Sequence, residues 1–187
     1  MRRWGTALAA VVLAGAGLMG VTTAAGAASA PTAACATGWG SGVKSHEPAE
    51  YKALDTIRTG THDCFDRMVF DVGGADTGAI GYHVGYVDAF HQDGSGRPIP
   101  VDGGAILEVR VGAPSHDPRA TRSRTRSCGP ALPGVDVTDY RTFRDTRFGA
   151  SFEGDTQVGL GVRARLPFRV FQSGEHLIVD VAHSWNA

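Results

Sequence analysis

A strict alternation of apolar and polar side chains in one short segment constrains the fold of this 187-residue chain more than any other feature. Met68, Phe70 and Val72 fall on one side of a period-two pattern. Arg67 and Asp71 fall on the other side. Successive side chains of a β-strand point to opposite faces, so this pattern is typical of a strand with one buried and one solvated face.

Short apolar segments separated by turn signals recur along the chain and predict an all-β fold without helices. The turn signals include Asp93-Gly94-Ser95-Gly96, which fits a turn better than a calcium-binding loop because further acids at alternate positions are missing. Many short strands of this kind favour an antiparallel β-sandwich, with a closed β-barrel as the alternative. The predicted strands cover residues 54–60, 65–73, 80–89, 98–102, 104–112, 135–140, 149–154, 156–162, 167–172 and 175–182.

Residues 1–30 have the three-part layout of a secretory signal peptide. Arg2 and Arg3 precede an apolar run over residues 7–21, and a stretch of small residues follows at 24–30. The run is shorter than the roughly 20 residues that a spanning helix needs, so cleavage is favoured over a retained membrane anchor. We therefore expect a secreted or envelope-associated protein that has no membrane span after cleavage.

After cleavage, residues 31–50 are expected to form a flexible N-terminal arm, and residues 51–187 a single β-domain. Trp39, the large apolar side chain of the arm, is expected to dock on this domain. Removal of Arg2 and Arg3 with the signal peptide leaves 16 of the 18 basic residues against 19 acidic ones, a net charge of −3. This balance excludes a general nucleic-acid-binding protein, which would carry a strongly basic face.

Three cysteines in an exported chain cannot all pair with one another. We predict a disulfide between Cys35 and Cys64, which would tie the arm to the strand that begins at residue 65. A bridge between Cys64 and Cys128 is the alternative. Cys35 also follows small residues, as a lipidated cysteine does. Lipid attachment is disfavoured, however, because the apolar run ends well before Cys35 and Thr32 stands where such a motif has a leucine-like residue.

The segment 113–134 is rich in proline and arginine and predicts a long exposed loop without core residues. A solvated loop, dispensable for folding, is the simpler interpretation. Contact with an anionic wall polymer is the alternative, because arginine side chains suit phosphate groups. The arginines concerned are Arg119, Arg122, Arg124 and Arg126.

Charged side chains on three predicted strands and tyrosines on a fourth are the candidate ligand-binding residues. The charged residues can form either a ladder of pairs across strands or a surface for a ligand. The tyrosines can either pack in the core or stack on the sugar rings of a glycan. The candidates are Arg67, Asp71, Tyr82, Tyr86, Arg169 and Asp180.

Catalytic and metal-binding patterns are weak in this sequence. His176, Asp180 and His183 lie close together near the C-terminus, but they do not have the spacing of a metal site with supporting partners. His62 and Cys64 could place a nucleophile beside a base, yet an exported cysteine is more often oxidised than reactive. We predict no catalytic residue, no metal and no cofactor.

A set of short stretches, in their order along the chain, carries a family resemblance. The stretches are Cys35 with Trp39-Gly40-Ser41, His62 to Asp71, Gly81-Tyr82 with Tyr86, Asp93 to Gly96, Ser151-Phe152-Glu153-Gly154, Gly159-Leu160-Gly161, Pro167-Phe168-Arg169-Val170 and Val179-Asp180-Val181-Ala182-His183. Over residues 35–185 the chain resembles the AMIN-like domain of secreted actinobacterial proteins. AMIN domains proper are β-sandwich modules that accompany cell-wall amidases and envelope secretion proteins.

The resemblance implies a non-catalytic module that binds peptidoglycan or an anionic wall polymer. One alternative is an interaction module that adds an edge strand to an envelope protein. Another is a small secreted hydrolase that uses an unrecognised site of histidines and acids. Amidase activity is not expected, because the sequence has no zinc-hydrolase motif and no second domain.

Overall fold

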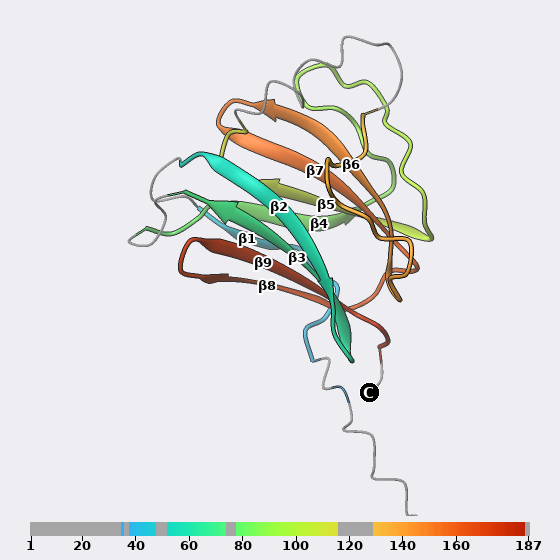
Figure 1. Ribbon diagram of the computed structural model, residues 1–187. Coiled ribbons are helices and arrows are strands. Elements are labelled where there is room, and N and C mark those ends of the chain that lie inside the picture. Colours follow the sequence, from blue (N-terminus) through green and yellow to red (C-terminus); the bar gives the residue numbers. More distant parts are fainter. Residues whose placement is uncertain (1–34, 36–37, 48–51, 74–77, 116–128, 186–187) are drawn as a thin grey trace, which may run out of the picture. The chain divides into compact units, whose positions relative to one another are not determined.

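Strands make up the regular secondary structure of the described residues, which are 35, 38–47, 52–73, 78–115 and 129–185 of a computed structural model (Figure 1). The strands are β1 (Lys44–His46), β2 (Leu54–Thr61), β3 (Phe65–Val72), β4 (Tyr82–Val87), β5 (Ala105–Val111), β6 (Phe143–Phe152), β7 (Asp155–Val162), β8 (Phe168–Ser173) and β9 (His176–Ala182). Among these residues no helix is long and apolar enough to cross a membrane. The prediction of an all-β fold is confirmed.

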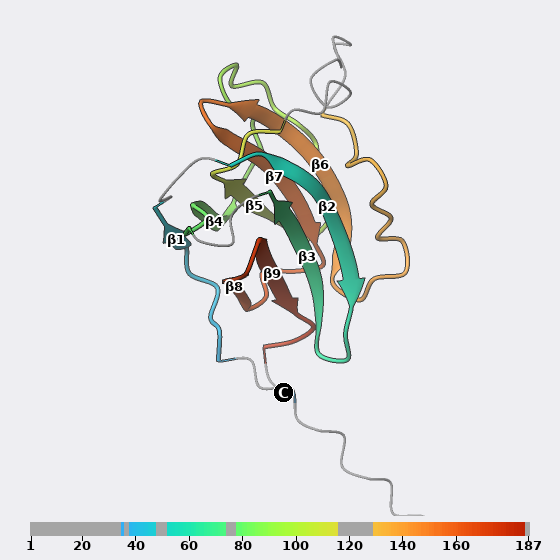
Figure 2. The same ribbon diagram turned by 60° about the vertical axis from the view of Figure 1, so that its left-hand side comes forward.

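The strands form two antiparallel sheets that pack face to face (Figures 1 and 2). The five-stranded sheet has the order β1-β4-β5-β7-β6, and the four-stranded sheet has the order β2-β3-β9-β8. Inward side chains from both sheets belong to one hydrophobic cluster. The fold is therefore the predicted sandwich and not the closed barrel.

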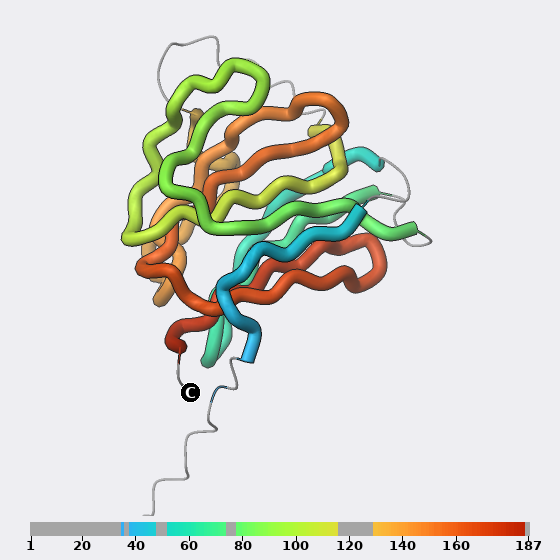
Figure 3. Tube along the Cα trace, turned by 180° about the vertical axis from the view of Figure 1, so that it is seen from behind, coloured from blue at the N-terminus to red at the C-terminus, as the bar shows by residue number. Residues whose placement is uncertain are grey.

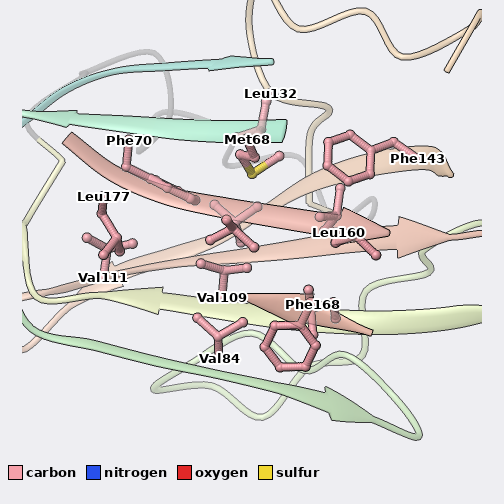
Figure 4. Close-up of a cluster of buried hydrophobic side chains, with 14 of the residues drawn as sticks. Met68, Phe70, Val84, Val109, Val111, Leu132, Phe143, Leu160, Phe168 and Leu177 are labelled. Carbon is pink, nitrogen blue, oxygen red and sulfur yellow. The ribbon is translucent and has the colours of Figure 1, made fainter. Parts of the chain in front are cut away.

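The alternation that predicted β3 corresponds to the two faces of the four-stranded sheet. Met68 and Phe70 are 0% exposed, and Val72 is 1% exposed. Figure 4 shows Met68 and Phe70 in the same cluster as Val109 and Leu160 of the opposite sheet. Burial of a side chain of this size contributes roughly 1.5–3 kcal/mol, so the inward face holds β3 in register.

Two predicted strands, at 98–102 and 135–140, are not formed. Pro98 and Pro100 lack the backbone donors of a regular strand, and the first segment makes only the isolated bridge from His91 to Pro98 among the described residues. In the second segment, the carboxylate of Asp136 accepts a hydrogen bond of 3.0 Å from the backbone of Thr138. This local bond stabilises a turn instead of a strand.

Two other strands are present in the structure but were predicted too short or not at all. β6 begins at Phe143, not at 149, and its register shifts at Phe143/Asp145 and at Phe148/Ala150. Such bulges break the period-two pattern from which a strand is recognised. β1, which lies within the predicted arm, pairs with β4 and was not expected as a strand.

The ends of segment 113–134 are part of the core, so the prediction of a loop without core residues is wrong there. Ala113 is 0% exposed and Leu132 is 5% exposed, and Figure 4 places Leu132 among the core side chains. The carbonyl of Pro114 accepts from the Leu54 N–H (3.0 Å), and that of Pro130 from the Phe148 N–H (2.9 Å). The four arginines of the segment lie outside the described residues.

Replacement of residues 116–128 by a short Gly/Ser linker is expected to change the free energy of unfolding by less than about 1 kcal/mol, because the entropy of loop closure varies slowly with loop length. Replacement of the whole segment 113–134 also removes Leu132 and is expected to cost roughly 2–5 kcal/mol. Thermal unfolding of the two variants measures the difference. Equal losses of stability would show that the arginine segment itself packs on the domain.

The outer face of the five-stranded sheet is covered by the connection between β4 and β5. Phe90 in this connection is 1% exposed, and a Cβ atom added at Gly159 or Gly149 would lie 2.7 Å from its ring. A Cβ at Gly161 would collide with the backbone oxygen of Asp102. The glycines therefore let the connection lie flush on this sheet.

The predicted turn at Asp93–Gly96 lies within this connection and is confirmed. The Gly96 N–H donates to the Gln92 carbonyl (2.9 Å), and Gly94 has a φ of 73°. The buried side chain of Gln157 in β7 holds the turn, because its Oε1 accepts from the Asp93 N–H (3.0 Å) and its Nε2 donates to the His91 carbonyl (2.9 Å).

Candidate functional site

The outer face of the four-stranded sheet carries a row of three charged residues. Arg67 of β3 lies opposite Asp180 of β9, and Asp180 lies opposite Arg169 of β8. The three side chains thus come from neighbouring strands and point to the same side of the sheet. The structure brings together three of the six candidate ligand-binding residues in this row.

Asp180 is fully buried (0% exposed) and holds both arginines. Its carboxylate accepts from Arg67 Nε (2.6 Å) and Nη2 (2.8 Å). It also accepts from Arg169 Nε (2.8 Å), and Arg169 Nη2 lies 2.8 Å from Oδ2. The hydrogen bond to Asp180 raises the pKa of Arg67 against the opposing effect of burial. Two guanidinium groups against one carboxylate leave a local net charge of +1.

Aromatic rings border the row on both sides. Phe65 precedes Arg67 by two residues in β3, and Phe171 follows Arg169 by two residues in β8, so the two rings flank the row from opposite sides. The Arg169 guanidinium carbon lies 5.4 Å from the Phe65 ring centroid, 5.0 Å from that of Phe171 and 4.4 Å from that of Trp39. These are cation–π distances.

We call this group the arginine–aromatic cluster: Arg67, Asp180, Arg169, Trp39, Phe65 and Phe171. Its aromatic members were not among the predicted ligand-binding residues. Phe65 and Phe171 could have been found from the sequence, because each is two positions from a candidate arginine on the same strand and must share its face.

The disulfide predicted between Cys35 and Cys64 is present and brings Trp39 to the cluster. The two Cα atoms are 5.3 Å apart, and Cys64 directly precedes β3. Beyond Trp39, the Gly40 carbonyl accepts from the Phe168 N–H of β8 (2.9 Å). Figure 3 shows this N-terminal segment, in blue, beside β8, in red. The docking of Trp39 is confirmed, whereas Cys128 lies outside the described residues.

Asp71 lies on the same face but belongs to a second group, with Arg58, Thr56 and His176. It accepts from Arg58 Nε (3.0 Å) and Nη2 (3.1 Å) and from the Thr56 hydroxyl (2.6 Å), and His176 Nδ1 lies 2.7 Å away. Burial alone would raise the pKa of Asp71. The hydrogen bonds from Arg58 and Thr56 and the charges of Arg58 and His176 outweigh burial, so the pKa is lowered.

Tyr82 and Tyr86 lie on β4 of the opposite sheet and pack against the core, so the structure does not bring them to the charged face. The Tyr86 hydroxyl donates to the Leu166 carbonyl (2.8 Å) and accepts from the Leu166 N–H (2.9 Å). Burial raises the pKa of Tyr86. Tyr82 stacks on His46 and lines a cavity of about 140 Å³ that also touches Arg110.

The histidines and acids considered for chemistry make structural contacts. Buried Asp66 accepts from the backbone N–H groups of Thr142 (2.6 Å) and Phe143 (3.1 Å). His183 Nδ1 is 2.9 Å from the Thr142 hydroxyl, and His183 Nε2 is 2.9 Å from the His62 carbonyl. These bonds tie the β2–β3 turn, the start of β6 and the end of β9 together. In the described part of the chain no three such residues are grouped as metal ligands.

The fold is a β-sandwich whose four-stranded sheet carries this charged, aromatic cluster on its outer face. A family model described as the AMIN-like domain matches residues 52–183. The chain belongs to the AMIN-like domain family, as the resemblance predicted. No curated protein and no solved structure matches the chain.

Proposed function

We propose that this protein is a non-catalytic extracytoplasmic module that binds peptidoglycan or an associated wall polymer through the arginine–aromatic cluster on the outer face of the four-stranded sheet. The observation that carries the proposal is the asymmetry between the two outer faces. The connection around Phe90 covers the face of the five-stranded sheet. The other face carries the arginine–aromatic cluster, and the described segment around Trp39 lies at one end of it.

The buried carboxylate of Asp180 supports a functional role for the cluster. A buried ion pair is weak evidence for stability, since well-packed apolar residues in its place are often neutral or stabilising. Asp180 does orient the two arginines, because its carboxylate lies within 2.8 Å of two nitrogens of each partly exposed guanidinium group. Preorganised arginines reduce the entropy lost when a ligand binds.

The form of the site favours binding over hydrolysis. A hydrolase needs an acid and a base that converge on a space for substrate. Here the Asp66 carboxylate accepts from the Thr142 backbone, the Thr142 hydroxyl contacts the His183 ring, and the thiol of Cys64 is consumed in the disulfide. The arginine–aromatic cluster, by contrast, lies on an open sheet face.

The proposed location also rests on the cysteines. A disulfide between the N-terminal segment and β3 fits an oxidising compartment. The layout of residues 1–30 agrees with export to such a compartment. A wall polymer is within reach of a protein exported in this way.

Trp39→Ser is expected to weaken binding to purified sacculi by roughly thirtyfold, because truncation of a central aromatic residue at a binding surface costs about 2 kcal/mol or more. The assay is co-sedimentation of the exported protein over a range of concentrations. Trp185→Ser is the matched control, since Trp185 is also an indole at the surface (52% exposed) but lies outside the cluster. Its affinity is expected to be that of the wild type.

Two results would contradict the proposal at different levels. If wild-type protein does not sediment with sacculi at any concentration, the proposed function is wrong. If it does sediment and the two tryptophan variants bind equally well, wall binding uses another surface. The thermal unfolding temperature of each variant, measured in parallel, separates loss of binding from loss of fold.

A further inference from the structure

We infer that the arginine–aromatic cluster recognises an isolated carboxylate group on a glycan or glycopeptide, one carboxylate per domain. This inference rests on the proposed function and specifies the chemistry of the ligand. It follows from the unused hydrogen-bond donors of the cluster, its charge and its aromatic borders.

Both guanidinium groups keep donors available. Asp180 engages Nε and Nη2 of Arg67 and of Arg169. In the part of the chain that the structure describes, Nη1 of neither arginine has a hydrogen-bond partner. The side chains are 24% and 39% exposed, so these donors are accessible to a ligand. Donors on a charged guanidinium are matched best by a carboxylate or phosphate oxygen.

The charge of the cluster favours a ligand group with one negative charge. Two arginines against the single carboxylate of Asp180 give +1, and the neighbouring pair of Arg58 and Asp71 adds none. The chain without Arg2 and Arg3 has 16 basic and 19 acidic residues, so its net charge is −3. A net negative protein repels a dense polyanion, so the local +1 favours a single charge on an otherwise weakly charged polymer.

The aromatic rings of the cluster can contact the sugar or peptide carbons next to such a carboxylate. Arg67 lies 5.1 Å and 5.6 Å from the ring centroids of Phe65 and Phe171, and Arg169 lies over Trp39. The guanidinium groups thus occupy ring faces that would otherwise be open to stacking. A sugar ring or peptide carbon next to the carboxylate would contact the rims of these rings while the oxygens bind Nη1. Recognition of a neutral sugar by stacking alone does not explain the arginines.

The variants Arg67→Lys and Arg169→Lys test the inference by changing the protein while the ligand stays the same. Lysine keeps the charge and can pair with Asp180, but it lacks the second branch of donors and the planar group that packs on the rings. Each change is expected to weaken binding to untreated sacculi by roughly tenfold or more. Arg58→Lys is the matched control, because Arg58 is on the same face, also makes two bonds to a carboxylate and is outside the cluster. It is expected to bind like the wild type.

Modified ligands test the inference without any change to the protein. The probes are purified sacculi in three forms: untreated, with carboxylates converted to amides, and with phosphate polymers removed by acid. We expect wild-type protein to bind the first and third forms equally and to lose at least about tenfold in affinity for the amidated form. Vesicles that contain an anionic phospholipid are expected not to bind.

The other possible outcomes contradict either carboxylate recognition or wall binding, and they can be told apart. Equal binding to amidated and untreated sacculi, or wild-type affinity in both arginine variants, would refute carboxylate recognition while leaving wall binding in place. Loss of binding when only the phosphate polymers are removed, or capture by anionic vesicles, would assign the cluster to phosphate groups. No binding to any sacculi would refute the proposed function itself.

Discussion

Replacement of both Cys35 and Cys64 by serine is expected to lower the free energy of unfolding by roughly 3–4 kcal/mol. The bridge spans a sequence separation of 29, and closing a loop of that length restricts the unfolded chain by about this amount in the chain-entropy model. For a domain of this size, the melting temperature should fall by roughly 6–16 °C. Thermal unfolding of the double variant measures the effect.

The same variant is expected to release Trp39 from the cluster. Burial of one indole contributes roughly 2–3 kcal/mol, which does not by itself offset the entropy of ordering the N-terminal segment. Tryptophan fluorescence should therefore shift toward that of a solvated indole, and affinity for sacculi should fall with it. Wild-type protein treated with a reductant is the control and should behave in the same way. An unchanged melting temperature in both would show that the disulfide does not anchor this segment.

Asp66→Ala is expected to destabilise the domain by about 4 kcal/mol. The Asp66 carboxylate is 0% exposed and accepts from the N–H groups of Thr142 and Phe143, which are also 0% exposed. Without it, two buried donors have no acceptor, and each such donor costs about 1–3 kcal/mol. Asp63→Ala, in the turn just before β3, is the control, because Asp63 is exposed, and it should change stability by less than about 0.5 kcal/mol.

Chemical denaturation of the two variants provides the comparison. Asp66→Asn should lie between them, since an amide oxygen can still accept from one or both donors without the charge. If Asp66→Ala unfolds like Asp63→Ala, the bonds to the start of β6 add little to stability. In that case the start of β6 is held mainly by its other contacts, which include the Thr142–His183 bond and the packing of Phe143.

Much of the fold could be read from local periodicity, and the misses have local causes. β3, β5, β7 and β9 were predicted because their apolar residues recur at every second position and face one core. β6 was predicted too late, because its two bulges shift the period. β1 was missed since three residues carry too little pattern to be recognised. The segment 98–102 was predicted as a strand from its apolar residues, but Pro98 and Pro100 lack the backbone N–H groups that a regular strand needs.

The candidate site was predictable only in part. Arg67, Arg169 and Asp180 were predicted as charged residues on the polar faces of strands. The local sequence did not indicate that Asp180 would be buried, or that Asp71 would pair with Arg58 and stay outside the cluster. Those outcomes depend on which strands become neighbours. For Tyr82 and Tyr86 the sequence left both a core position and a glycan-stacking surface open, and the structure places them in the other sheet, against the core.

The sequence by itself determined the all-β class and the membership in the AMIN-like family, because these depend on patterns that are local or ordered along the chain. The export expected from residues 1–30 stays a prediction. Only the tertiary structure decided that the connection around Phe90 covers the outer face of the five-stranded sheet and that the arginine–aromatic cluster assembles on the other sheet. Strand order places Asp180 between two arginines from strands far apart in sequence, and the disulfide places Trp39 beside them. These contacts are long-range, and the free energy that selects them comes from burial of the shared core, which no single segment encodes.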